Sequence, residues 1–123
     1  MKLGPLWLKI QIACGDALAM GPGKADLLEA IIAEGSISGA GRALGMSYRR
    51  AWLLVDEMNR CFDPVLVETL KGGGRERGAK VSATGLAVLE AYREMEREAA
   101  AIAERPAYVR LSEHLRTEPI PTD

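Results

Sequence analysis

The stretch that decides the fold runs from Gly35 to Asn59 and reads GSISGAGRALGMSYRRAWLLVDEMN. It opens with small residues and serines and continues as an amphipathic pattern with paired arginines at its start. Serine is favoured just before a helix, and glycine ends a helix by adopting the left-handed conformation. We therefore predict a short helix from Ser38 to Leu44, a turn at Gly45 and a second helix capped by Ser47.

Two short helices that cross at a steep angle need small residues where they meet. Gly41, Gly45 and Ala51 follow one another at spacings of four and six, which is typical of a helix-turn-helix. The same pattern is compatible with two helices that simply pack together. The flanking sequence decides between these readings.

Outside this stretch, hydrophobic periodicity and turn residues predict the remaining elements. They are a strand over Leu6–Ile12, a loop over Cys14–Gly23, a helix over Lys24–Glu34, strands over Val65–Leu70 and Lys80–Ser82 joined by a glycine-rich turn, and a long helix over Ala83–Glu104 capped by Ser82. Pro106 should stop the last helix. The order predicts a mainly α fold with a small β wing, a winged helix-turn-helix, in which residues 1–104 form one domain and 105–123 a C-terminal tail.

The last predicted helix carries apolar residues at the alternating spacings of four and three that are typical of a coiled-coil seam. These seam residues are Val88, Tyr92, Met95, Ala99 and Ile102. The seam is longer than a small domain needs, so we expect it to form a homodimer interface.

Composition excludes several classes of protein. The 123 residues are 48% hydrophobic and 27% charged, which is typical of a globular protein, and no apolar run reaches the length of a membrane span. Without an export signal, a cytoplasmic location and two reduced thiols at Cys14 and Cys61 are expected, although a disulfide between them is the alternative. His114 is the only histidine, so we predict no enzyme, no metal site and no cofactor.

Charge is distributed unevenly although the net charge is only −1. The segment from Ser36 to Ser82 has eight basic and five acidic residues, a net charge of +3, and the rest of the chain carries −4. In a helix-turn-helix, the exposed start of the second helix enters the major groove of DNA. Double-stranded DNA is therefore the expected partner, with no membrane partner.

The candidate DNA-contacting residues come from both helices and from the wing: Ser38, Arg42, Ser47, Tyr48, Arg49, Arg50, Arg75, Arg77 and Lys80. An arginine can pair with two acceptors of guanine or hold a phosphate. We expect Arg49 to reach base edges and Arg50 to hold a phosphate. Tyr48 could contact the DNA backbone or pack on Trp52 one turn later.

Five short matches, GSIS at Gly35–Ser38, SYRRAW at Ser47–Trp52, EMN at Glu57–Asn59, LVE at Leu66–Glu68 and GGG at Gly72–Gly74, carry a family resemblance. With them the chain resembles the N-terminal DNA-binding domain of the ModE-type molybdate-responsive regulators. The resemblance implies a homodimer, joined through the N-terminal strand and the long last helix, that binds a palindromic operator. Family members continue into two small β-barrel domains that bind molybdate. This sequence does not include them, so we expect no molybdate binding by this chain.

Two alternatives remain open at this point. GSIS with a helix-turn-helix fits a LysR-like DNA-binding fragment equally well, with a different operator and effector. Winged helices also serve as protein-interaction modules that do not bind DNA.

Overall fold

The computed structural model describes residues 2–3, 6–70 and 78–122. The helices are α1 (Pro22–Glu34), α2 (Ile37–Ala43), α3 (Tyr48–Cys61), α4 (Ala83–Ala99), a 3-10 turn η2 (Ala100–Glu104) and α5 (Pro106–His114), and the strands are β1 (Lys2–Leu3), β2 (Leu6–Trp7), β3 (Ile12–Cys14), β4 (Ala17–Met20), β5 (Val67–Thr69) and β6 (Ala79–Val81). No helix within the described ranges is long and apolar enough to cross a membrane.

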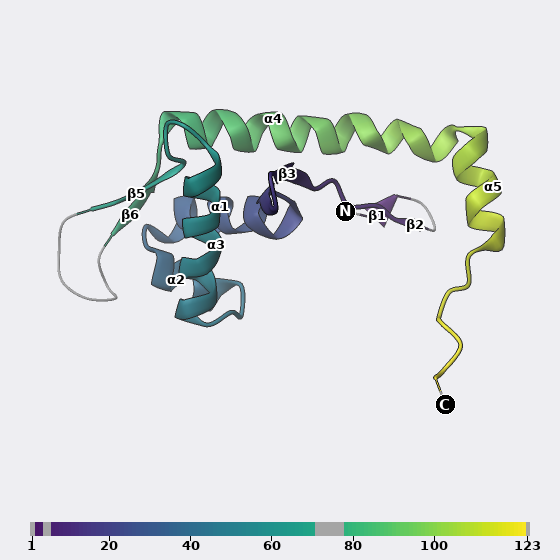
Figure 1. Ribbon diagram of the computed structural model, residues 1–123, viewed down its shortest axis with the longest axis horizontal. Helices are drawn as coiled ribbons and strands as arrows, with labels where there is room; N and C mark the ends of the chain where they lie inside the picture. Colours follow the sequence, from purple (N-terminus) through teal and green to yellow (C-terminus); the bar gives the residue numbers. More distant parts are fainter. Residues whose placement is uncertain (1, 4–5, 71–77, 123) are drawn as a thin grey trace.

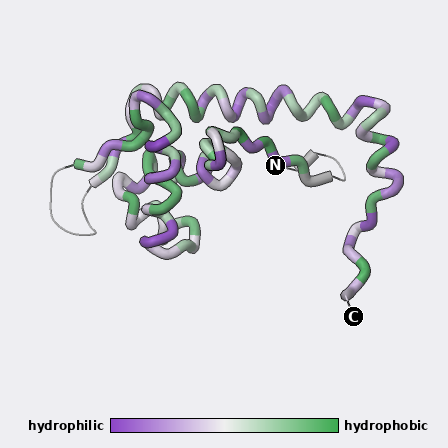
Figure 2. Tube along the Cα trace, viewed as in Figure 1, coloured by the Kyte–Doolittle hydropathy of each residue, from purple (hydrophilic) through white to green (hydrophobic). Residues whose placement is uncertain are grey.

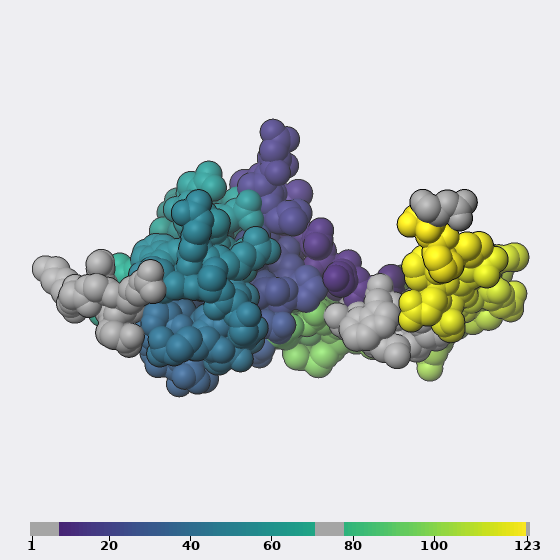
Figure 3. All heavy atoms as spheres, turned by 90° about the horizontal axis from the view of Figure 1, so that it is seen from below, coloured from purple at the N-terminus to yellow at the C-terminus, as the bar shows by residue number. Residues whose placement is uncertain are grey.

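The helices α1, α2 and α3 gather beneath one end of the long helix α4, and the wing β5–β6 extends beside them (Figure 1). The other end of α4 reaches away from this group and turns into α5, so the molecule is elongated (Figure 3). The strands form antiparallel pairs, β1 with β2, β3 with β4, and β5 with β6. This arrangement confirms the predicted winged helix-turn-helix with a long C-terminal helix.

The turn between α2 and α3 forms as the sequence predicts. Gly45 has a φ of 70°, in the left-handed region, and the Ser47 hydroxyl accepts a hydrogen bond from the backbone N–H of Arg50 at 3.0 Å. A Cβ at Gly41 would lie 3.3 Å from the Cβ of Ala51. The absent side chain therefore lets the two helices approach closely at their crossing.

The start of α2 differs from the prediction. The N-cap is Ser36, whose hydroxyl accepts from the N–H of Gly39, and Ser38 lies inside the first turn. A Cβ at position 39 would lie only 2.9 Å from that hydroxyl oxygen. The absent side chain of Gly39 therefore leaves the Ser36 hydroxyl room to reach the backbone N–H.

The core joins one face of α1, α2, α3 and α4 to the wing. Its fully buried members include Met20, Leu27, Leu28, Ile31, Val55, Met58, Leu66 and Tyr92. Asn59 attaches the wing to α3, because its amide oxygen accepts from the N–H groups of Leu66 and Val67 and its amide nitrogen donates to the carbonyl of Val67. The position of the wing relative to α3 is thus fixed by one side chain and the core beneath it.

Arg93 ties the long helix to α1. Its guanidinium forms ion pairs with Asp26 at 2.7 Å and with Glu29, both on α1, and with Glu96 one turn along α4. Burial alone would lower the pKa of Arg93, but these three carboxylates outweigh it and raise the pKa. The guanidinium therefore stays charged and fixes α4 across α1.

The N-terminal region corrects two predictions. The expected single strand over Leu6–Ile12 is interrupted, since β2 ends at Trp7 and β3 begins at Ile12. The expected loop after Cys14 instead returns as β4, with Cys14 paired with Ala17 across a turn at Gly15, whose φ is 59°. β3 gains its backbone partner from β4 rather than from a longer strand, and hairpin pairing of this kind is not visible in hydrophobic alternation alone.

The C-terminal region corrects another prediction, that of a C-terminal tail after the helix stop at Pro106. Pro106 does end the preceding helix, but it is also the first residue of α5, where its missing N–H is not needed. Tyr108 is buried there against Leu8, Ala99 and Ala103. The predicted C-terminal tail, residues 105–123, therefore contains a helix as far as His114, and α4 itself ends at Ala99 and continues as the 3-10 turn.

Candidate nucleic-acid interface

The N-terminal end of α3 carries a concentration of positive charge. Arg49 and Arg50 are both exposed there, next to the helix N-terminus, whose dipole is positive. Within residues 2–3, 6–70 and 78–122, neither guanidinium forms a hydrogen bond or ion pair. The acidic residues of α3 come later and have partners: Asp56 pairs with Arg60, and Glu57 with Lys24.

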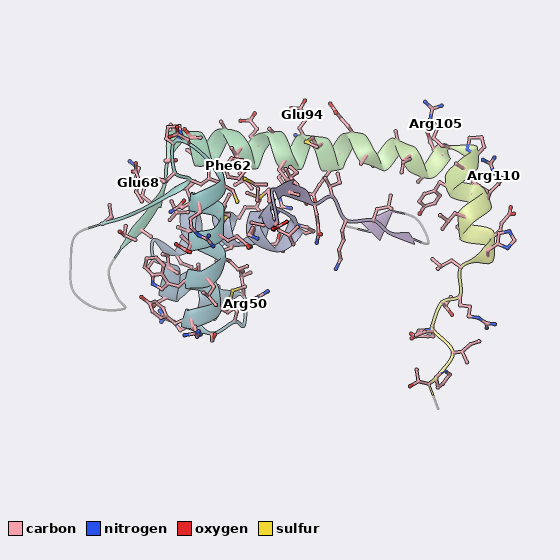
Figure 4. All side chains as sticks on the ribbon, viewed as in Figure 1. Arg50, Phe62, Glu68, Glu94, Arg105 and Arg110 are labelled. Carbon is pink, nitrogen blue, oxygen red and sulfur yellow. The ribbon has the colours of Figure 1, made fainter. Side chains whose placement is uncertain are left out.

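The opposite face of α3 holds the helix in place. Ala51, Val55 and Met58 are buried in the core. Figure 4 shows Arg50 at one end of this helix and Phe62 at the other, where the chain turns towards the wing. The helix is thus anchored along its length while its first turn projects into solvent, which is the arrangement that groove entry requires.

Arg50 borders a shallow depression between α3, the start of α1 and the β3–β4 hairpin. Its lining includes Gln11, Leu18, Gly21 and Lys24. Lys24 is buried and forms an ion pair of 2.5 Å with Glu57. The hydrogen bond from Lys24 lowers the pKa of the Glu57 carboxyl below its ordinary value, against the opposing effect of desolvation. The ion pair therefore fixes α1 against α3 beside the exposed Arg50.

Tyr48 packs on Trp52, one of the two readings that its sequence position allowed. The rings meet edge to face with centroids 6.5 Å apart, and the Trp52 indole N–H donates a hydrogen bond to the Tyr48 hydroxyl. Tyr48 is half-buried. This contact stiffens the first turn of α3 and fixes the direction in which the tyrosine ring points.

Ser38 has a different role from the one predicted. It is only 5% exposed, and its hydroxyl accepts a hydrogen bond of 3.0 Å from Nη1 of Arg42 one turn later. A direct DNA contact by Ser38 would require its buried side chain to leave the helix interface. The structure instead gives Ser38 the role of positioning Arg42, which is exposed on α2.

The basic residues of the wing divide into two groups. Lys80 is exposed on β6, opposite Glu68 on β5, and lines an apolar hollow with Ile31, Ile32 and Leu86. This hollow is separate from the depression beside Arg50. The structure therefore does not bring Lys80 together with the arginines of α3. Arg75 and Arg77 lie outside the described residues.

The predicted seam of the long helix separates into covered and uncovered positions. Tyr92 is 1% exposed, and its hydroxyl donates a hydrogen bond of 2.7 Å to the carbonyl of Ile10. Its place in a dimer interface is therefore wrong, because this chain's own core covers it. Val88 packs against the same core, and Ala99 against Tyr108. Met95 and Ile102 remain 42% and 46% exposed.

A metal ion would need a group of His, Cys, Asp or Glu side chains as its ligands. No three of these side chains are grouped within the described residues so that they could bind one. The ion pair of Lys24 and the strand clamp of Asn59 were missed from the sequence. In the sequence, the EMN motif was the one feature that marked these two contacts. Its Glu57 forms the ion pair, its Met58 lies in the core, and its Asn59 binds the wing.

Comparisons with known proteins agree with this geometry. The molybdenum-pterin-binding protein MopA of Rhodobacter capsulatus is 35% identical over 92 residues, which are 75% of this chain and 35% of MopA. The DNA-binding transcriptional dual regulator ModE of Escherichia coli K12 is 34% identical over 87 residues, which are 71% of this chain and 32% of ModE. This chain is a homologue of the ModE-type regulators.

The matched region spans about a third of the length of these ModE-type relatives. No family model matches the chain. Among solved structures, the full-length LysR-type regulator LysG of Corynebacterium glutamicum, with bound effector Arg, is similar with a TM-score of 0.50 and 31% identity, over 76% of this chain and 30% of LysG. The homology to ModE-type regulators and the likeness to LysG both support the winged-helix fold.

Proposed function

We propose that this chain is a transcriptional regulator that binds double-stranded DNA sequence-specifically through α3. The observation that carries the proposal is the exposed pair Arg49 and Arg50 at the capped N-terminus of a helix whose other face is buried. The homology to ModE, which is described as DNA-binding, supports the same function. The uneven charge of the chain supports it further, because the basic segment contains α2, α3 and the wing.

The two arginines have different roles in this proposal. Successive residues of a helix point about 100° apart. Arg50 borders the depression shared with the hairpin and the start of α1, so it faces the wall of the groove and holds a phosphate. Arg49 projects away from that depression and reaches the base edges. Arg42, held by Ser38 on the preceding helix, adds a second contact to the DNA backbone.

Arginine substitutions test these roles. The operator is first selected from random DNA fragments bound by the full chain. Arg49→Ala should then weaken operator binding by roughly 1–3 kcal/mol and relax the preference at one base pair. Arg50→Ala should weaken binding to operator and random DNA alike and lower the salt slope by about one. Arg60→Ala is the matched control, because it removes the same charge from the far end of α3.

Three results would contradict the proposal. The double variant at Arg49 and Arg50 could stay folded and bind operator as tightly as the wild type, which would exclude groove reading by α3. Arg60→Ala could weaken binding as much as either, which would reduce the effect to general charge. Binding could also be insensitive to salt, whereas roughly six to ten phosphate contacts should lose about 10³–10⁵ in affinity between about 50 and 200 mM salt. Insensitivity would favour the protein-interaction alternative.

The active form in this proposal is a homodimer whose interface includes Met95 and Ile102. Both are exposed apolar residues, Met95 on α4 and Ile102 on the 3-10 turn η2 that follows it. Changing both to Glu should give monomers in light scattering and weaken binding to a palindromic operator. The control changes Val65 and Ile120, which are also exposed, to Glu. A wild-type chain that is monomeric at micromolar concentration would reject the dimer.

Two finer points remain predictions. The absence of molybdate binding is checked by titrating molybdate while following thermal stability, with sulfate as the control for ionic strength. A saturable rise in Tm with molybdate alone would contradict it. The LysR-like alternative is favoured by the similarity to LysG. It shares the DNA-binding role and differs in operator and effector, so the sequences selected from random DNA distinguish it.

A further inference from the structure

Leu53 is an apolar residue on the exposed side of α3. Its side chain is 52% exposed, whereas the adjacent Leu54 is half-buried and packs against the core. Along α3, hydrophilic residues at the N-terminal end are followed by hydrophobic ones (Figure 2). Core packing accounts for Leu54 but not for Leu53. Exposed leucines are common on protein surfaces, so the position of this one on the helix decides what it can do.

Leu53 lies one turn beyond Arg49 on the same face of α3. Residues four apart on a helix are neighbours on its surface, and both of these side chains are exposed. The buried residues of the helix, Ala51, Val55 and Met58, mark the other face. At about 100° per residue, Leu53 lies nearly opposite the centre of that buried face. Leu53 therefore projects to the side on which Arg49 meets DNA in the proposed function.

The same exposed face continues into a pair of opposite charges. Asp56, the next exposed residue on this side, forms an ion pair of 3.0 Å with Arg60. The two charges neutralise one another, so this end of the face attracts DNA less than the first turn does. The first two turns are left to read bases, with hydrogen-bond donors from Arg49 and an apolar surface from Leu53.

We propose that Leu53 contacts the C5 methyl group of a thymine in the major groove, close to the base that Arg49 reads. This inference rests on the proposed function and adds a second specificity-determining residue to it. Among the groups that base pairs present in the major groove, the thymine methyl is the apolar one. A leucine side chain forms no hydrogen bonds, so against a polar base edge it would displace water without replacing the lost hydrogen bonds.

The helix geometry sets where this thymine lies. Arg49 and Leu53 are separated by about 6 Å along the helix, at about 1.5 Å per residue. Successive base pairs of DNA are about 3.4 Å apart. The thymine should therefore lie within about two base pairs of the position at which Arg49→Ala relaxes the base preference.

Replacing thymine by uracil tests the contact, because uracil forms the same base pair and lacks the methyl group. The operator selected by the full chain is synthesised with uracil at one thymine position at a time, and binding is measured by fluorescence anisotropy at one salt concentration. Uracil at the predicted position should weaken binding by the wild-type chain about fourfold, which corresponds to about 0.8 kcal/mol for one methyl group. Leu53→Ala should bind the thymine operator more weakly and no longer distinguish thymine from uracil there.

Leu86→Ala is the matched control. Leu86 is 49% exposed and lies on α4, so the variant removes an equally exposed leucine side chain outside α3. It should keep the wild-type preference for thymine. Both variants should keep the Tm of the wild type, because substitutions at exposed positions change stability little.

Three outcomes would overturn the inference. The selected operator could specify no thymine near the base that Arg49 reads, or uracil could leave wild-type binding unchanged at every such thymine. Leu53→Ala could also keep the wild-type preference for thymine, which would assign the methyl contact to another residue. In each case a chain that still depends on Arg49 and Arg50 retains the proposed function. A double arginine variant that binds as tightly as the wild type would instead remove both.

Discussion

Gly85, in the first turn of α4, allows the sharpest test of the packing described above. A Cβ built at this residue would lie 2.4 Å from the carbonyl oxygen of Leu66 and 2.6 Å from a methyl carbon of Val81. The nearer neighbour is backbone, so the helix or the start of the wing must move. Overpacking of this kind costs about 1–3 kcal/mol, and the better helix propensity of alanine offsets about 1 kcal/mol of it. Gly85→Ala should therefore lower the free energy of unfolding by up to about 2 kcal/mol.

Gly23 is the matched control for this substitution. It also lies in the first turn of a helix, α1, but a Cβ there would meet no atom within 4 Å. Gly23→Ala should be neutral or stabilising by about 0.5–1 kcal/mol. Urea unfolding followed by circular dichroism, at one protein concentration for all variants, measures both changes. A Gly85→Ala variant as stable as Gly23→Ala would refute the close approach of α4 to the carbonyl of Leu66.

Three further predictions concern the contacts that hold α3 and α4. Asn59→Ala should lower the free energy of unfolding by about 1–3 kcal/mol, because two backbone N–H groups at the start of the wing lose their acceptor, and the same urea assay measures it. Glu57→Gln should be less stable than the wild type at neutral pH. In urea unfolding, this difference in stability should shrink as the pH falls through the lowered pKa of Glu57, because a protonated Glu57 no longer forms the ion pair with Lys24. Tyr92→Phe should lose about 1 kcal/mol of stability with its hydrogen bond to the chain and leave the oligomeric state in light scattering unchanged, whereas a seam role for Tyr92 would alter the oligomeric state.

The elements whose ends are set by local chemistry could be predicted from the sequence. Ser47 and Ser82 cap α3 and α4 because each hydroxyl reaches a backbone N–H three residues ahead. Gly35 ends α1 in the left-handed conformation, with a φ of 77°. The spacing of Gly41 and Ala51 indicated the helix crossing for the same reason, since contact at a crossing depends on side-chain size at fixed helical intervals.

The choice between two adjacent candidates was beyond a local reading. Ser36 and Ser38 are both good N-cap residues, and the geometry of the turn after α1 selects Ser36. The β3–β4 hairpin was missed for a related reason. Its strands are short, and they are held by pairing with each other and by packing on α3, which hydrophobic alternation within one segment does not report.

By itself, the sequence determined the winged helix-turn-helix, its capped helices and the exposed arginines at the start of α3, because these follow from short-range spacing and from which residues tolerate water. The tertiary structure alone decided which apolar residues of α4 and of the 3-10 turn η2 after it stay uncovered. The heptad spacing places Tyr92, Met95 and Ile102 on the same face of the predicted helix. The chain's own core nevertheless covers Tyr92 and leaves the other two exposed. Periodicity marks a face of a helix, whereas burial depends on which segments reach that face. Here the carbonyl of Ile10, far away in the sequence, lies within hydrogen-bonding distance of the Tyr92 hydroxyl.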